Sequence, residues 1–249
     1  MPSSPITTSM IADLIAGHDQ NRPRSKQRAI GPSQIGGPCP RRLGYQIAGV
    51  PEVNQCGLNL APWIGTAAHE QMAKVLEAHP DWRSEMVVTI PDTEHLSGTG
   101  QPIRGTADAY HAPSKTVVDW KFTADSTINN TRLRGEPDLA YSTQVQLYAY
   151  GLTRTGVPVN DVAVVFLPRS GNPRQMHVWT APYDEQIAQA ALERLASIRL
   201  LAEQGMFAEL PTAQYFCESC PWYLPASTRL DEACPGHPRT NHTSGWNSK

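Results

Sequence analysis

The chain has 249 residues, enough to bury one substantial hydrophobic core, so we expect one main domain with added segments. Hydrophobic residues make up 40% and charged residues 18%, as in soluble globular proteins, which argues against disorder outside the chain ends. The formal net charge of -2 excludes a general attraction to nucleic acid, so any such contact needs a local basic surface.

Residues 1–30 are predicted to form an appended arm, because glycine and proline break the chain directly after them. The arm holds a short amphipathic stretch and a basic run, and a basic pair follows. This pattern is consistent with a local basic surface and also with a solvated charge run. Neither a secretion signal nor a membrane span is expected, which favours a cytoplasmic protein without membrane contact. The basic residues are Arg22, Arg24, Lys26, Arg28, Arg41 and Arg42.

The first half of the main domain is predicted to form a helix, three strands and a second helix. Apolar residues at helical spacing predict a helix over residues 61–79, with His69 near its middle. Pro137 precedes the second helix, which ends near Arg154. Between them, the spacing is typical of an antiparallel meander. Its strands are expected at residues 85–90, 103–110 and 116–120.

The second half continues with a hairpin of residues 161–167 and 175–180, and then a long helix over residues 183–204. Gly205 is placed to end that helix. After Pro211 the composition changes to Cys, Pro, Trp and Gly without periodicity, so we expect this tail to be held by something other than a large core. The predicted units are the arm at 1–30, a core at 31–210 and a Cys-rich tail at 211–249.

Two carboxylates and a lysine follow one another near the ends of two neighbouring strands. Asp108 lies on the second predicted strand, and Asp119 and Lys121 lie at the end of the third. Because side chains alternate along a strand, Asp119 and Lys121 face the same side. If the strands pair, Asp108 lies beside Asp119, and the two carboxylates repel unless a divalent cation sits between them. Such a cation can activate water against a phosphodiester, and Lys121 can offset developing negative charge.

Three more side chains are expected near this centre. His69 could complete the metal shell from a helix packed across the sheet edge, although a lone helical histidine is more often a surface or core residue. Gln144 and Tyr148 share a helix face, where they could contact a DNA backbone, brace the metal site or serve helix packing. The agreement of order, spacing and predicted elements favours a functional site.

These motifs resemble the RecB-like nucleases of the PD-(D/E)XK superfamily, over about residues 33–235. The resemblance implies an α/β (α+β) fold with a restriction-endonuclease-like core, whose central mixed sheet is flanked by helices and followed by a metal-bound Cys-rich segment. It also implies DNA cleavage with Mg²⁺ or Mn²⁺. The implied metal ligands are His69, Asp108, Asp119 and the Trp120 carbonyl, with Lys121 as catalytic lysine. The motifs are G-x-x-x-H-E at 65–70, G-x-x-D at 105–108, D-x-K at 119–121 and Q-x-x-x-Y at 144–148.

A cysteine far upstream of a C-terminal trio resembles the iron–sulfur RecB-type exonucleases, which include the CRISPR-associated single-strand exonuclease and the AddB nuclease domain. This resemblance implies a 4Fe–4S cluster, although the gap before the last cysteine is longer than those families usually have. The residues alone leave a zinc site open, in which His237 replaces Cys39. Cys56 is expected to be a spare thiol. The implied cluster ligands are Cys39, Cys217, Cys220 and Cys234.

Three functions remain open from the sequence. The first is a DNA exonuclease acting on single strands or duplex ends. The second is a catalytically inactive DNA-binding or scaffold protein of the same fold, and the third is a restriction-type endonuclease. The tail resembles exonucleases encoded by bacteriophages, which implies a role in phage recombination, replication or repair in the bacterial host cytoplasm. A recombinase or single-strand-annealing protein would be the matching partner.

Overall fold

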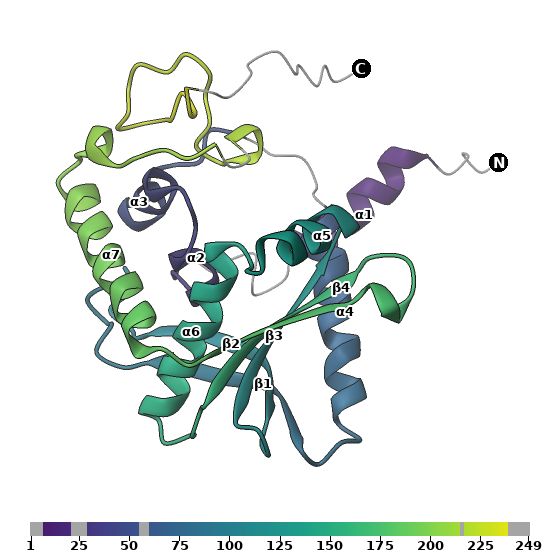
Figure 1. The fold of residues 1–249 in the computed structure, drawn as a ribbon. Coiled ribbons are helices and arrows are strands. Elements are labelled where there is room, and N and C mark those ends of the chain that lie inside the picture. Colours follow the sequence, from purple (N-terminus) through teal and green to yellow (C-terminus); the bar gives the residue numbers. More distant parts are fainter. Residues whose placement is uncertain (1–6, 21–28, 55–59, 215–216, 239–249) are drawn as a thin grey trace.

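The computed structural model describes residues 7–20, 29–54, 60–214 and 217–238 (Figure 1). The basic run of residues 22–28 and Cys56 lie outside the described residues. The helices are α1 (Thr8–Gln20), α2 (Pro32–Ile35), α3 (Pro40–Ala48), α4 (Leu60–Leu76), α5 (Asp125–Arg134), α6 (Leu139–Arg154) and α7 (Glu185–Glu203). The strands are β1 (Trp82–Ile90), β2 (Ile103–His111), β3 (Thr116–Thr123), β4 (Asp161–Pro168) and β5 (His177–Pro182). Short 3-10 helices are η2 (Pro173–Gln175), η3 (Phe207–Glu209) and η4 (Cys217–Ser219).

The described strands form one sheet in the order β1-β2-β3-β4-β5. The pairs β1–β2, β2–β3 and β4–β5 are antiparallel, which confirms the predicted meander and hairpin. β3 and β4 run parallel, so the chain crosses over between them through α5 and α6. The sheet is therefore mixed, as predicted.

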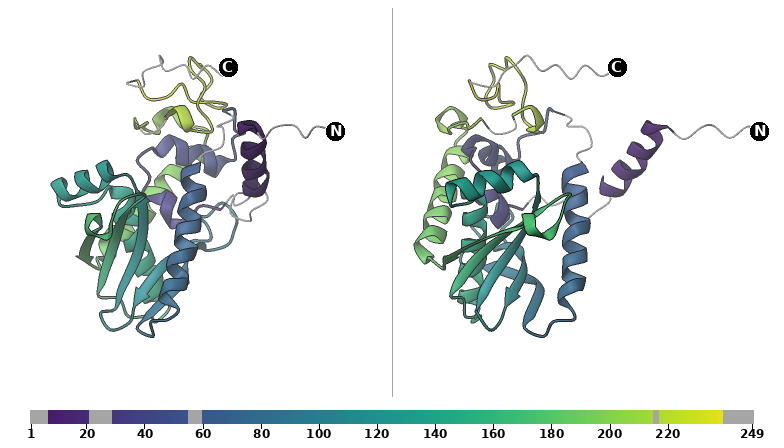
Figure 2. Two further views of the ribbon diagram at one scale, coloured as in Figure 1. Left: turned by 90° about the vertical axis from the view of Figure 1, so that its right-hand side faces the viewer. Right: turned by 45° about the vertical axis from the view of Figure 1, so that its right-hand side comes forward.

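Helices cover both faces of the sheet (Figure 2). α6 packs on one face through a buried cluster that includes Val145, Ala149 and Phe166. α4 packs on the other face, where Leu76 is buried with residues of β3 and β4 such as Val118 and Ala163. The prediction that the His69 helix crosses the sheet edge is therefore wrong. An apolar stripe on α4 needs a wide apolar surface to cover it, and the sheet face provides one.

In the antiparallel β-ribbon formed by β1 and β2, the side chains of both strands switch from one face of the sheet to the other at the same level. Residues two apart on a strand normally share a face, yet Ala107 packs on the α6 side and Ala109 on the α4 side. On β1, Glu85 has a φ of 51°, which is rare for a residue other than glycine, and it interrupts the pairing opposite Asp108. β2 and β3 pair through residues 109–111 and 116–118. Asp108 therefore lies where the ribbon bends and the two strands part.

The tail packs on α3 and α7 through a third buried cluster. Trp222 and Cys234 belong to the same cluster as Leu195 of α7, so the tail is held in part by a large core, contrary to our expectation. Tyr45 of α3 donates hydrogen bonds from its hydroxyl to the carbonyls of Leu230 and Ala233, at 2.8 and 3.2 Å. α3 and the tail, which are far apart in the sequence, are thus joined by packing and hydrogen bonds (Figure 1).

The remaining predicted elements agree with the structure within a few residues, and Gly205 follows α7 with a φ of 71°. α2, α3 and α5 were not predicted. Among the described helices, none is long and apolar enough to cross a membrane.

Candidate active site and cysteine pocket

A cleft of about 1050 Å³ opens between α4, α2 and the strands β2 and β3. α4 contributes residues of one stripe, among them Thr66, His69 and Ala73, which recur at helical spacing. Asp108, Asp119 and Lys121 line the same cleft. Residues that were predicted from separate motifs are therefore brought together, including Trp120, Gln144 and Tyr148.

Asp108 is 9% exposed and is held from two sides. The imidazole Nδ1 of His69 lies 2.9 Å from Asp108 Oδ1. The backbone N–H of Trp120 donates to Asp108 Oδ2 at 2.7 Å. The parting of β2 and β3 leaves this N–H without a strand partner on β2, and the carboxylate satisfies it instead. Asp108 thus bridges α4 and β3.

Asp119 is 1% exposed and belongs to a hydrogen-bonded network with α6. The side-chain amide of Gln144 donates to Asp119 Oδ1 at 2.9 Å and to the Tyr148 hydroxyl at 2.8 Å. Lys121 Nζ donates to Gln144 Oε1 at 3.0 Å and lies 2.6 Å from Asp119 Oδ2. Gln144 and Tyr148 are both buried, so in this structure they brace Asp119 and Lys121.

The electrostatics of the site favour an added positive charge. Burial raises the pKa of Asp119 to about 6, against the opposing charge of Lys121 and with the support of Asp108. Burial alone would lower the pKa of His69, but its hydrogen bond to Asp108 and the nearby negative charges leave that pKa raised. Burial also opposes the charge of Lys121, and Asp119 outweighs it, so the pKa of Lys121 is raised. Each charge in the site therefore depends on its neighbours.

The donor chemistry fits a hard divalent cation, because carboxylate oxygens are its preferred ligands. Asp119 Oδ2 is buried and accepts no regular hydrogen bond from the described residues, although Lys121 Nζ is close. Within the described residues, no three His, Cys, Asp or Glu side chains stand as a formed metal site. Asp108 Oδ1, Asp108 Oδ2 and Asp119 Oδ1 each have one protein donor and keep a further lone pair, so a cation can be held without loss of these contacts.

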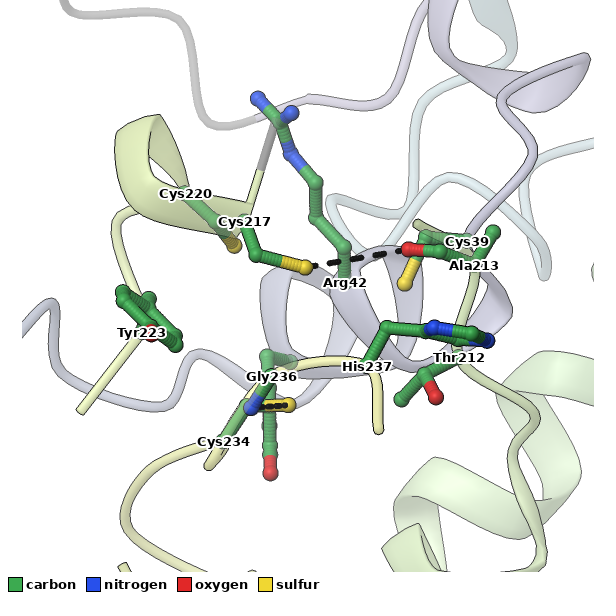
Figure 3. A pocket seen from close by; sticks show the side chains of 11 residues that line it. Cys39, Arg42, Thr212, Ala213, Cys217, Cys220, Tyr223, Cys234, Gly236 and His237 are labelled. Carbon is green, nitrogen blue, oxygen red and sulfur yellow. Dashed lines mark hydrogen bonds between the residues drawn. The ribbon is translucent and has the colours of Figure 1, made fainter. Parts of the chain in front are cut away.

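Four cysteines line a second pocket, between α3 and the tail (Figure 3). They are Cys39, which directly precedes α3, Cys217 and Cys220 around η4, and Cys234 in the tail, and all four are free thiols. Their sulfur atoms point into the pocket from different sides (Figure 3). The structure therefore brings together residues that are up to 195 positions apart, counted from Cys39 to Cys234.

His237 lines the same pocket, but its imidazole points away from Cys217 and Cys220 toward Thr212 (Figure 3). The contacts of the sulfur atoms are weak: Cys217 Sγ lies 3.8 Å from the Ala213 carbonyl, and Gly236 N donates to Cys234 Sγ at 3.4 Å. Burial raises the pKa of Cys220. The described side chains of this pocket, like those of the cleft, do not converge on a single ion.

Comparison with protein families matches residues 62–223 to the PD-(D/E)XK nuclease superfamily. The match covers more than half of the chain and includes His69, both aspartates, Lys121, Gln144 and Tyr148. The chain belongs to this superfamily. Comparison with curated proteins gave no match. PD-(D/E)XK nucleases generally use divalent metal ions such as Mg²⁺ or Mn²⁺, in agreement with the donor set of the cleft.

Solved structures with the fold of this PD-(D/E)XK chain include exonucleases. LHK-Exo in complex with dAMP has 13% sequence identity and a TM-score of 0.52, over 72% of this chain and 90% of that chain. The same exonuclease from Laribacter hongkongensis without a stated ligand gives 12% identity and a TM-score of 0.49, over 73% and 91%. A phage-related exonuclease from Haemophilus somnus gives 14% and 0.44, over 82% and 90%. At 13% identity, the similarity to the LHK-Exo complex concerns the fold alone.

Sequence reasoning missed some residues of this PD-(D/E)XK site. Lys121 Nζ lies 4.8 Å from the ring centroid of Tyr141, and Phe122 packs beside His69 with ring centroids 5.6 Å apart. Tyr141 lies three residues before Gln144, so helical spacing could have placed it on the same side of α6. Arg104 also lines the cleft, four residues before Asp108 on β2. Its place on the strand that carries Asp108 was the available signal for this arginine.

Proposed function

We propose that this chain is a divalent-metal-dependent DNA exonuclease, in which Asp108 and Asp119 hold the metal together with His69 and the Trp120 carbonyl. The observation that carries the proposal is the network at the floor of the cleft. Two buried carboxylates from parting strands lie there with Lys121, whose ammonium is 2.6 Å from Asp119. Such a centre suits the hydrolysis of a charged phosphodiester better than packing, because buried carboxylates are costly to desolvate.

Each residue of the network has a task in this proposal. A bound Mg²⁺ or Mn²⁺ would activate water and offset charge on the phosphate. Lys121 presents its ammonium toward the same side, where it stabilises negative charge in the transition state. Gln144 holds both Lys121 and Asp119 through hydrogen bonds, and Tyr148 accepts a hydrogen bond from Gln144. His69 orients Asp108 from α4. These contacts fix the geometry before substrate binds.

The substrate and the exonuclease activity belong to the proposal. The complex of LHK-Exo with dAMP supports a nucleotide substrate for a related fold. A DNA substrate is also what the superfamily leads us to expect. A single strand or a duplex end is the substrate that we propose for the cleft.

The test is to incubate the purified chain with Mg²⁺ or Mn²⁺ and end-labelled linear or covalently closed circular DNA. We expect short products from single-stranded and duplex linear DNA and no cleavage of circles. Cleavage of circles would indicate a restriction-type endonuclease. Metal-independent DNA binding without any product would indicate the inactive DNA-binding alternative. Removal of the metal by EDTA should stop cleavage and leave the fold intact by circular dichroism.

A 4Fe–4S cluster held by Cys39, Cys217, Cys220 and Cys234 is the second part of the proposal. The arrangement of four thiols around one pocket supports a cluster, which is wider than a single ion. The imidazole of His237 points away from Cys217 and Cys220, which argues against a zinc site made with that residue. Iron and zinc analysis of protein purified without oxygen tests the choice. About four iron atoms per chain would support the cluster, and one zinc would overturn it.

The biological role and the division of the chain rest on the sequence. We propose a role in phage recombination, replication or repair, with a recombinase or single-strand-annealing protein as partner; co-purification of the tagged chain with such a protein tests it. The arm at 1–30, the core at 31–210 and the tail at 211–249 are proposed units. Limited proteolysis should cut first near residue 30 if the arm is a separate segment.

A further inference from the structure

The cationic side chains that line the cleft differ in how far the protein already uses them. Lys121 contacts Asp119 and Gln144. Arg169 donates from Nε to the Phe122 carbonyl at 3.3 Å. Arg104 is exposed, and no described residue accepts a hydrogen bond or forms an ion pair with its guanidinium. Its charge is therefore available to a ligand that enters the cleft.

The backbone fixes where Arg104 stands relative to the carboxylates. Arg104 and Asp108 lie four residues apart on β2, which is about 13 Å at the rise of a strand. Gly105 keeps this stretch pressed against its neighbours, since a Cβ there would lie 2.9 Å from both Pro32 and Tyr148. Residues before and after Arg104 are thus packed, while its own side chain is free of the core.

We propose that Arg104 binds a backbone phosphate of the DNA strand whose scissile phosphate lies at Asp108 and Asp119. This inference rests on the exonuclease function proposed above and adds a second anchoring point to it. The distance corresponds to at most about four phosphates at the 3.4 Å rise of a stacked strand. Arginine suits this task, because its planar guanidinium donates two parallel hydrogen bonds to a phosphate.

Lys74 is the other cation of the cleft without a contact to a described side chain, and it is the weaker choice. On α4 it is flanked at helical spacing by Glu70 and Glu77, whose charges oppose its own. On β2, the uncharged Thr106 lies between Arg104 and Asp108 in the sequence, and all three residues line the cleft. Arg104 can thus attract the strand without neutralising the carboxylates that hold the metal.

The experiment measures binding of single-stranded DNA by fluorescence anisotropy in Ca²⁺, which occupies hard-cation sites with slow or no cleavage. A set of oligonucleotides carries one neutral methylphosphonate linkage, moved one phosphate at a time from the end. Wild-type protein should lose roughly tenfold in affinity at one linkage within the first several positions, as expected for one charge-assisted contact. Arg104→Ala should lose a similar factor on unmodified DNA and show no further loss at that linkage. Its log–log salt slope should fall by about 0.7.

The matched control is Arg83→Ala, which removes an exposed arginine of the same β-ribbon that does not line the cleft and lies 5.9 Å from the Tyr110 ring. It should keep the wild-type affinity and pattern. Arg104→Gln, which keeps a polar side chain but removes the charge, should behave as Arg104→Ala.

An unchanged affinity of Arg104→Ala, or the same sensitive linkage as in wild type, would overturn the assignment. Because binding is measured without cleavage, the two proposals fail separately. If the chain cleaves DNA but Arg104→Ala binds DNA as the wild type does, the phosphate subsite is refuted. If the linkage pattern is observed but the chain has no nuclease activity, the exonuclease proposal is refuted.

Discussion

The cleft and the cysteine pocket both gather side chains that can bind a metal, but they differ in how strongly the protein itself holds these side chains. In the cleft, Asp108 and Asp119 are fixed by contacts of 2.6 to 2.9 Å. In the pocket, the Cys217 and Cys234 sulfur atoms have contacts of 3.8 and 3.4 Å. The cleft is therefore preorganised by its own hydrogen bonds. The pocket relies on the packing around it and on whatever the thiols bind.

This contrast predicts two kinds of failure. Substitutions in the cleft should remove chemistry while the fold remains. Substitutions in the pocket should loosen the contact between α3 and the tail, and activity should fall only with the folded fraction.

The largest effect is expected from Asp119→Asn. The amide keeps the shape and can still pair with Gln144, but it removes the negative charge that the metal needs, so cleavage should fall by about three orders of magnitude or more. Stability should change little, because relief of the burial that raises the pKa of Asp119 to about 6 is offset by loss of the ion pair that supports the charge of Lys121. Nuclease assays and thermal unfolding measure both. Glu94→Gln, an exposed carboxylate outside the cleft, is the control, and cleavage by Asp119→Asn at the Glu94→Gln rate would refute the metal site.

Lys121→Met should follow, with a loss of about 10² to 10³ in turnover, since it removes one charge that stabilises the transition state. Mn²⁺ affinity by calorimetry should be unchanged or tighter, because the ammonium no longer competes for Asp119 Oδ2. If turnover stays at the wild-type level, Lys121 is a structural partner of Asp119 and no more.

Cys39→Ser should act on stability. A cluster that joins Cys39 to Cys217 closes a loop of 178 residues in the sequence, and the cross-link model gives roughly 5 kcal/mol as an upper figure for its loss. Hydrogen exchange should rise in α3 and in the tail, while the cleft keeps its protection. Cys56→Ser is the matched thiol control and should change neither property. Loss of cleavage in fully folded Cys39→Ser protein would break the proposed separation of the two regions.

Tyr148→Phe should give the smallest effect. It removes the hydroxyl that accepts a hydrogen bond from Gln144, and one such bond contributes about 1 kcal/mol. Turnover should fall roughly fivefold, since a free-energy loss of that size at the transition state has this effect. Tyr110→Phe is the control, because its hydroxyl donates to the Pro158 carbonyl outside the cleft at 2.6 Å. Equal turnover in both variants would make Tyr148 a packing residue.

The sequence predicted the strands and the longer helices because their apolar residues recur with a clear period. α5 was missed since its sequence, Asp125–Arg134, carries no apolar stripe, and of its side chains only Ile128 and Thr131 are buried. α3 was missed because Arg41 and Arg42 were interpreted as part of a basic surface. In fact Arg41 Nε donates to the carbonyls of Phe207 and Leu210, at 2.9 and 3.1 Å, so it serves structure.

The candidate site was likewise predicted only in part from the sequence. Spacing placed Asp119 and Lys121 on one side of a strand, and the structure agrees. It could not foresee that Asp108 would reach across to the Trp120 N–H, because that contact depends on the bend at Glu85 and on the parting of two strands. Nor could spacing decide between the possible roles of Gln144, since its partners come from another element.

The docking of the tail on α3 also sets the order in which the molecule can be completed during synthesis. The hydroxyl of Tyr45 bonds to the Leu230 carbonyl 185 residues later, and Trp222 Nε1 donates to the Val50 carbonyl 172 residues earlier. Contacts this distant in sequence close slowly, because a long loop must be ordered first. Every residue of the cleft leaves the ribosome before the tail does. A nascent chain can therefore assemble its carboxylate centre before the three tail cysteines are available to join Cys39 in the pocket.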